Sequence, residues 1–279
     1  MGRKSWVPYS PVPSIHIDLD NYSVYRDSIH RSINIDKFDI YEDCLPTILK
    51  YLSKYSVRAS FFVVGRDVNR SRTAQKMLRK AIKQGHEIGN HTMNHLKNFI
   101  NLDVEKRSKE ISECHEILQT KLGIKPTSYR APGYAFRRDD IEILSELGYK
   151  NDFSRTSVVY KILTELYFIT KSRRSKRFLR LVHFDMKSQS KKNLVRKFES
   201  ITKVHKPIRM TNISTVWYQE MSMTKSRTSK IQKQAKPIIL LHAIDFLNHE
   251  DRNSPIPALR VPLKTRLNEI EKLLTRISS

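Results

Sequence analysis

One stretch of the chain governs its interpretation: Gly85-His86-Glu87-Ile88-Gly89-Asn90-His91-Thr92-Met93-Asn94-His95. It sets two imidazoles four residues apart where a strand gives way to a helix. On a helical turn, residues i and i+4 share one face. Neutral imidazole is the commonest protein ligand for zinc-like cations. The spacing therefore predicts that His91 and His95 hold one metal ion, with a further ligand supplied from elsewhere in the chain.

Two carboxylates near the start of the chain are candidates for that further ligand. The apolar run 14–17 leads directly into Asp18-Leu19-Asp20. Side chains two residues apart on a strand point to the same face. We therefore expect Asp18 and Asp20 to face one site at the end of this strand.

Strand patterns alternate with helix patterns along the sequence. Apolar runs that suit buried parallel strands lie at 14–17, 59–64, 179–184 and 237–241, with weaker ones at 127–130 and 208–216. Helical stripes lie at 45–52, 74–82, 111–122, 143–147 and 267–277. Glycines at 85, 123 and 148 follow three of these stripes, as C-terminal caps do. The alternation predicts an α/β fold with a mainly parallel sheet, in which chemistry gathers at the carboxyl ends of the strands.

The length of 279 residues suits one α/β domain rather than two small ones. We expect an N-terminal extension at 1–13 and a catalytic domain at 14–279. The two cysteines, Cys44 and Cys114, sit at helix-like positions among apolar neighbours. This placement predicts two buried free thiols rather than a disulfide or metal ligands.

The net charge of +24 comes from 52 basic and 28 acidic residues. Two runs without any acid, 171–180 and 221–236, hold much of the excess, and an apolar, aromatic-bearing segment at 157–170 precedes the first. Three interpretations stay open: solvated loops, attraction to an anionic membrane surface, and attraction to nucleic acid. The sequence shows no recognition-helix signature or ribonucleoprotein aromatic motif, which disfavours nucleic acid.

No apolar run approaches the roughly 20 residues that span a bilayer. The first thirteen residues also lack the continuous apolar segment of a signal peptide. We therefore expect a cytoplasmic protein that can lie at the periphery of a membrane.

Two more polar groups follow apolar strands. Arg130 opens the turn Arg130-Ala131-Pro132-Gly133-Tyr134, and His242 closes the run 237–241. A single histidine after a strand is a weak signal, because most such residues are structural. The aspartate pair, the histidine pair, Arg130 and His242 together, in this order along the chain, form a specific pattern.

This pattern resembles the metal-dependent polysaccharide deacetylases that share the NodB homology domain and form carbohydrate esterase family 4. The resemblance rests on Ile17-Asp18-Leu19-Asp20, His91-Thr92-Met93-Asn94-His95, Arg130-Ala131-Pro132-Gly133 and Leu240-Leu241-His242, and it covers roughly residues 14 to 275. It implies a distorted, incomplete (β/α) barrel, similar to a TIM barrel.

The resemblance implies that Asp20, His91 and His95 hold a divalent metal, with zinc as the first expectation. Three protein ligands and an open position are the usual arrangement of a catalytic zinc site. The spaced Asp-x-Asp form looks like one branch of the family.

The resemblance also assigns acid and base roles. Asp18 would be the base, Arg130 would pair with it and hold it ionised, and His242 would protonate the departing amine. A backbone amide in the turn 131–134 would stabilise the oxyanion. Many members carry a tyrosine where this chain has Gly133, which still supplies its amide.

The aspartate that orients the acid histidine has no clean match in the sequence. Three candidates remain, and we rank Asp152 and Asp185 above Asp245. Two further histidines, at 16 and 86, are expected to be structural, whereas the role of His183 stays open.

The expected function is hydrolytic removal of an N-acetyl or N-formyl group from an amino sugar in a glycan or a lipid-phosphate-linked glycan precursor. One alternative is a non-catalytic sugar- or nucleic-acid-binding protein on the same fold. Another is an iron(II) oxygenase, which also uses two histidines and one carboxylate. That class has no need of Asp18, Arg130 or His242.

Overall fold

The structure is a computed structural model that describes residues 14–28, 38–135, 137–154, 209–210, 238–252, 254 and 256–278. Its strands are β1 (Ser14–Leu19), β2 (Ala59–Val63), β3 (Glu87–Asn90), β4 (Ser128–Tyr129), β5 (Asn151–Asp152), β6 (Arg209–Met210) and β7 (Ile238–His242). They form one sheet in the order β5-β4-β3-β2-β1-β7-β6. Every neighbouring pair is parallel, and no pairing among the described strands joins β5 to β6. The sheet is therefore an incomplete (β/α) barrel, as predicted.

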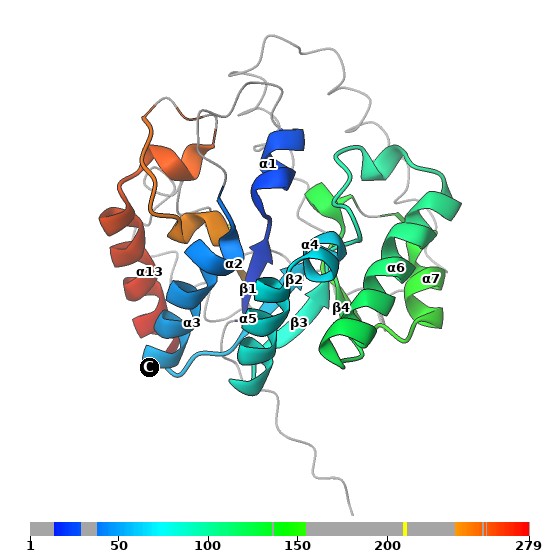
Figure 1. The fold of residues 1–279 in the computed structure, drawn as a ribbon, viewed down its shortest axis with the longest axis horizontal. Coiled ribbons are helices and arrows are strands. Elements are labelled where there is room, and N and C mark those ends of the chain that lie inside the picture. The colour runs from blue at the N-terminus through cyan, green and yellow to red at the C-terminus, as the bar shows by residue number, and fades with distance from the viewer. Residues whose placement is uncertain are drawn as a thin grey trace, which may run out of the picture.

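Helices surround the sheet, as Figure 1 shows. They are α1 (Tyr22–Ser28), α2 (Ile40–Asp43), α3 (Leu45–Lys54), α4 (Gly65–Arg70), α5 (Arg72–Lys83), α6 (Val104–Leu122), α7 (Asp140–Glu146) and α13 (Leu263–Ser278). Short 3-10 turns η1 (Phe99–Asn101), η2 (Pro132–Tyr134), η4 (Ala243–Phe246) and η5 (Pro257–Arg260) complete the described elements. In Figure 1, α3 and α13 lie on one flank and α6 and α7 on the other, while α1 sits beyond the tip of the β1 arrow.

The central strand β1 is buried on both faces. Ile15, Ile17 and Leu19 are at most 1% exposed and pack in the main apolar cluster with residues of α3 and β2. A parallel strand covered on both sides needs such continuous apolar composition. Polar groups on this strand therefore have to be paired, which concentrates attention on its histidine and its aspartates.

The expected elements agree with the structure where it describes them. The predicted strands at 14–17, 59–64 and 237–241 correspond to β1, β2 and β7. The helical stripes correspond to α3, α5, α6, α7 and α13, and the three capping glycines have positive φ angles. Cys44 and Cys114 are buried and free, which confirms that prediction.

Several predictions lie outside the described residues. These are the extension 1–13, the segment 157–170, the basic runs 171–180 and 221–236, the strand at 179–184, His183 and Asp185. Within the described parts of the chain, none of the helices combines the length and the apolar character needed to cross a bilayer.

Candidate active site

The carboxyl ends of the neighbouring strands β1 and β7 bring the first candidates together. In the parallel register of β1 and β7, Asp18 lies opposite His242. Asp20 follows β1 directly, and its side chain is 9% exposed. Because neighbouring parallel strands end at one edge of the sheet, these three residues share one end of the barrel.

Asp20, His91 and His95 form a compact trio. Oδ1 of Asp20 lies 3.6 Å from Nε2 of His91 and 3.6 Å from Nε2 of His95. One ligand atom from each residue lies within 4.8 Å of the others. The structure therefore brings together the three residues for which the sequence predicts a metal site.

The polarity of these atoms fits a cation. Nδ1 of His91 lies 2.7 Å from the carbonyl oxygen of Arg130, which can only accept, so Nδ1 carries the proton. The neutral ring then points the lone pair of Nε2 toward the Asp20 carboxylate. Oδ1 of Asp20 is buried and makes no hydrogen bond with any described residue. Lone pairs facing one another in a buried space are unfavourable unless a cation lies between them.

The protonation states suit the same interpretation. Burial lowers the pKa of His91, and burial lowers the pKa of His95 to about 4. Both rings are therefore neutral at pH 7, the form that binds a metal. Burial raises the pKa of Asp20, which makes its ionised form dependent on positive charge nearby.

The segment that carries the two histidines differs from the expectation. The sequence suggested a helical turn, but residues 91–95 form a loop in which Thr92 (φ 66°) and His95 (φ 52°) are left-handed. The His95 amide donates to Oγ1 of Thr92 (3.2 Å). The imidazoles therefore converge through a folded loop with a ring separation of 4.8 Å, and not through the face of a helix.

The candidate base lies beside the trio. Nη1 of Arg130 donates to Oδ1 of Asp18, and both side chains are buried. Burial raises the pKa of Asp18, but the Arg130 guanidinium, with smaller effects of His91 and His242, outweighs it, so the pKa lies below its usual value. Asp18 is therefore a carboxylate at neutral pH.

A histidine that was expected to be structural contacts this pair. Nη2 of Arg130 lies 2.7 Å from Nδ1 of His16, and a guanidinium can only donate, so Nδ1 accepts. The imidazole is 2% exposed and packs against the rings of Phe62 and Phe153. Arg130 is thus fixed between His16 and Asp18. His86, the other histidine expected to be structural, accepts a hydrogen bond from the Ala59 backbone N–H at its Nδ1 (3.2 Å).

The candidate acid faces the candidate base. Nε2 of His242 lies 3.9 Å from Oδ2 of Asp18, and the His242 side chain is 20% exposed. It is the more accessible member of the pair, because Asp18 is only 4% exposed. A substrate can therefore reach the imidazole from the solvent side.

Two of the three candidate aspartates for orienting His242 lie in the described residues, Asp152 and Asp245. Oδ2 of Asp245 accepts the backbone N–H of His242 (3.0 Å). Asp152, ranked higher, accepts the Ser154 amide with Oδ1 (2.8 Å). Asp245 therefore fixes the backbone at the end of β7. Asp185 lies outside the described residues, and which aspartate orients the His242 imidazole stays a prediction.

The turn after Arg130 has one amide left for a ligand. The Ala131 amide donates to Oγ of Ser154 (2.7 Å), and the Tyr134 amide donates to the Ala131 carbonyl (3.1 Å). Pro132 has no N–H. Gly133 is therefore the residue of this turn whose amide could serve an oxyanion.

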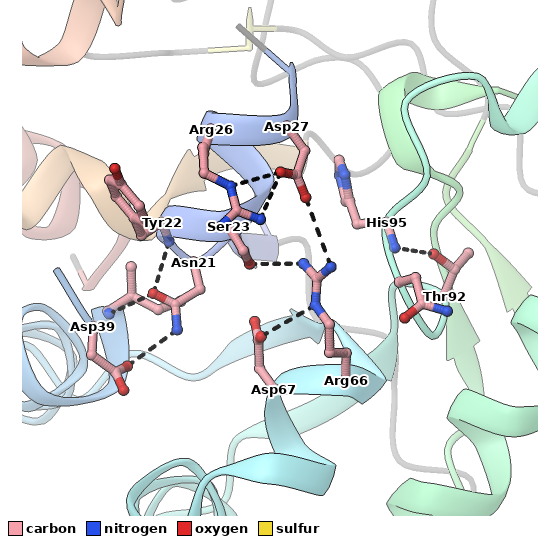
Figure 2. A network of polar contacts seen from close by, with 12 residues as sticks. Asn21, Tyr22, Ser23, Arg26, Asp27, Asp39, Arg66, Asp67, Thr92 and His95 are labelled. Atoms are coloured by element: carbon pink, nitrogen blue, oxygen red, sulfur yellow. Dashed lines mark hydrogen bonds and ion pairs between the residues drawn. The ribbon is translucent and has the colours of Figure 1, made fainter. Parts of the chain in front are cut away.

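A charged network connects α1 to the rim of the site (Figure 2). Arg66, from the start of α4, donates to Oγ of Ser23 (2.7 Å) and lies 4.0 Å from Asp27 and 3.8 Å from Asp67. Figure 2 shows the guanidinium extending toward α1 with His95 alongside. The network ties α1, the helix that follows Asp20, to α4, and the backbone amide of Arg66 donates to the Met93 carbonyl of the histidine loop (2.7 Å).

Sequence reasoning missed two residues that support the site, although a signal existed for each. His16 lies two residues before Asp18, so the same period of two that grouped the aspartates also places it on their face. Glu110 lies four residues before Cys114 on the buried face of α6. A charged residue on an apolar helical face is a reason to search for its partners.

Comparison with known proteins points to one family. Residues 32–151 match the family model described as polysaccharide deacetylase. That range includes His91, His95 and Arg130, whereas Asp18, Asp20 and His242 lie outside it.

The curated relatives match over part of their length. A peptidoglycan-N-acetylglucosamine deacetylase of Bacillus cereus is 33% identical over 105 residues, which is 38% of this chain and 47% of the relative. The uncharacterized protein YlxY of Bacillus subtilis is 29% identical over 148 residues, which is 52% of this chain and 45% of the relative. The matched part of the chain thus spans about half the length of these relatives.

A solved structure supports the fold. A Mycobacterium smegmatis protein assigned to the polysaccharide deacetylases matches with a TM-score of 0.53 at 16% identity, over 97% of this chain and 86% of that chain. At this identity the likeness concerns the fold alone.

Proposed function

Because the chain belongs to the polysaccharide deacetylase family, we propose that it is a metal-dependent hydrolase that removes an N-acetyl or N-formyl group from an amino sugar of a glycan. One observation carries the proposal: an Asp20 oxygen that has no hydrogen bond to any described residue lies 3.6 Å from the Nε2 atoms of both His91 and His95. We propose these three residues as ligands of a divalent metal, zinc first.

The residues around the proposed metal site would carry the proton transfers. A bound divalent cation would acidify a water molecule and polarise the acyl oxygen. Asp18, kept ionised by Arg130, would take the proton of the attacking water. The Gly133 amide would donate a hydrogen bond to the oxygen that becomes negative.

His242 would complete the reaction as the acid. When the C–N bond breaks, the nitrogen of the sugar needs a proton to leave as an amine. The imidazolium of His242 would donate it from Nε2, which faces the site 3.9 Å from Asp18. Base and acid would thus lie next to each other on neighbouring strands, at the same end of the sheet.

The names of the relatives suggest the class of substrate. They include deacetylases of peptidoglycan N-acetylglucosamine and of chitooligosaccharides. We propose an N-acylated amino sugar within a glycan. A lipid-phosphate-linked substrate and a position at an anionic membrane surface stay predictions, because the basic runs behind them lie outside the described residues.

A deacetylation assay tests the proposal. The protein is stripped of metal, reloaded with Zn²⁺, Co²⁺ or Mn²⁺, and incubated with chitooligosaccharides and peptidoglycan fragments while acetate and formate are measured. We expect release that chelator abolishes and metal restores, and at least a 10³-fold loss in His91→Ala, since removing a ligand removes the metal's whole contribution.

Two outcomes would contradict the proposal. Full turnover by His91→Ala would remove the metal site from the mechanism. Sugar binding by calorimetry without any acyl release, in the metal-loaded protein, would favour the alternative of a non-catalytic binding protein on this fold.

A further inference from the structure

The loop that carries the two histidines is held by contacts from several elements. The amides of Gly65 and Arg66, at the start of α4, donate to the carbonyls of Thr92 (3.0 Å) and Met93 (2.7 Å). A second set of contacts comes from Glu110 on α6, which the proposed mechanism does not use.

Glu110 binds the loop with its side chain and its backbone. Its Oε2 accepts the backbone N–H of Asn94 (2.8 Å), and its Oε1 accepts from Nδ2 of the same residue (2.7 Å). Its carbonyl oxygen accepts the Met93 amide (2.9 Å). The carboxylate is therefore matched to both donors of a single residue, and Glu110 is only 6% exposed.

The residue after Asn94 has an unfavourable backbone conformation. His95 has φ 52° and Thr92 has φ 66°, in the left-handed region where residues with a side chain are strained. Such conformations persist only where neighbouring contacts impose them. For His95 the nearest such contacts are the pair between Asn94 and Glu110 and the bond to Thr92 Oγ1.

The other histidine is held independently. His91 follows β3, its amide donates to the Val63 carbonyl (3.0 Å), and its Nδ1 is bound to the Arg130 carbonyl. Loss of the Glu110 carboxylate would therefore leave His91 in place and release His95 from its strained position.

We propose that Glu110 is a positioning residue that holds His95 within reach of the cation. This rests on the proposed metal site. The Glu110 carboxylate accepts hydrogen bonds from Asn94 and does not itself bind the metal. It would therefore affect metal binding through the position of His95. Partners outside the ligand set typically contribute 10- to 100-fold to metal affinity.

Metal binding can be measured without activity. Apo protein is titrated with Co²⁺ and followed by visible absorption, and Zn²⁺ affinity is measured by competition with a chromophoric chelator. We expect Glu110→Ala to bind both ions about 10- to 100-fold more weakly. Its Co²⁺ spectrum should shift toward that of a His95→Ala variant, because the same ligand is lost.

A conservative variant and a matched control separate positioning from folding. In Glu110→Gln, one oxygen still accepts the Asn94 amide, and the Asn94 side chain can turn its own oxygen toward the new NH₂ group. We expect this variant to recover most of the affinity and the wild-type spectrum. Glu116→Ala, an exposed position on the same helix, should bind like the wild type.

The outcomes distinguish this inference from the proposed function. Wild-type affinity and spectrum in a folded Glu110→Ala variant would overturn the positioning role and leave the metal site intact. If Glu110→Ala does not fold, Asn94→Ala removes one of the two hydrogen bonds, and unchanged affinity there would overturn it as well. A wild-type protein that binds neither ion would overturn both the proposed function and this inference.

Discussion

The two sides of the candidate site are built by different means. On one side, Asp18 and His242 are placed by the register of two neighbouring parallel strands, β1 and β7. On the other side, His91 and His95 lie on an irregular loop after a four-residue strand, in a conformation that depends on contacts from α4 and α6.

The two sides of the site should respond differently to the substitution of a single side chain. A strand end is fixed by a ladder of backbone hydrogen bonds and by apolar burial, so replacing one polar side chain leaves its neighbours in place. A strained loop has no such ladder, so its geometry depends on individual side chains. We therefore expect substitutions on the strand side to change chemistry without displacing the metal ligands, and those on the loop side to change the position of a ligand and stability together.

The largest expected effect is on the strand side. Asp18→Asn keeps the shape but removes the proposed base, so kcat should fall about 10²- to 10⁴-fold. Zn²⁺ affinity should stay near that of the wild type, because the three proposed ligands are untouched. Steady-state kinetics and a chelator competition assay measure the two quantities.

A matched control carries the same change of charge. Asp27→Asn, on α1 with a half-exposed side chain, should leave kcat close to the wild-type value. If Asp18→Asn lost metal affinity as severely as turnover, the two sides of the site would not be separable.

The next effect is on the loop side. Asn90 is fully buried, donates to the Ile111 carbonyl (2.9 Å) and the Tyr149 hydroxyl (2.6 Å), and accepts the Thr92 amide (2.8 Å). Asn90→Ala leaves these partners unsatisfied, which should lower the free energy of unfolding by about 3 kcal/mol. Urea denaturation measures it.

Asn151→Ala is the control, since that side chain is partly buried and, among the described residues, makes one long contact of 3.4 Å with Ser128 Oγ. We expect it to change the free energy of unfolding by less than about 1 kcal/mol. Equal losses of unfolding free energy in the two variants would mean that the hydrogen bonds of Asn90 stabilise the fold no more than the single long contact of Asn151.

The smallest effect is on the pH dependence of stability. Burial raises the pKa of Asp67, beside Arg66, from 3.8 to about 7. The folded state then binds a proton more tightly than the unfolded chain, so this group stabilises the fold at low pH and that contribution is lost as the pH rises toward 7.

Replacing Asp67 by asparagine should remove this loss. Relative to the wild type, the metal-free variant should become more stable by on the order of 1 kcal/mol per pH unit between pH 5 and pH 7. Urea unfolding at three pH values measures the difference. Parallel stability curves for the two proteins would show that Asp67 is not a proton-binding group of the folded state.

The same contrast explains how much the sequence could predict. The central strands β1, β2 and β7 are encoded locally, because continuous apolar runs are what a doubly covered parallel strand requires. The polar residues that end them follow from those boundaries. Capping glycines marked the ends of three helices for a similar local reason.

Other features depend on contacts between distant segments. The left-handed conformation of His95 is imposed partly by Glu110, which lies on another element, so the spacing of the two histidines suggested a helix instead. The strand β5 has two residues, too few for any periodic signal, whereas the weak run at 127–130 corresponds to β4. The contact between Arg130 and His16 joins residues 114 positions apart.

The position of β1 has a consequence for the order in which the site is assembled. The side chains proposed to hold the metal all precede residue 96, on β1 and the elements up to the end of the histidine loop. The proposed proton donor arrives only with β7, which docks on the opposite edge of β1. The proposed ligands thus come from an early part of the polypeptide, the contacts that hold two of them come later from Glu110 and Arg130, and the proposed acid comes with β7, the last of the described strands. The chemistry would therefore depend on the docking of β7, after the ligands and their supporting contacts are already in the chain.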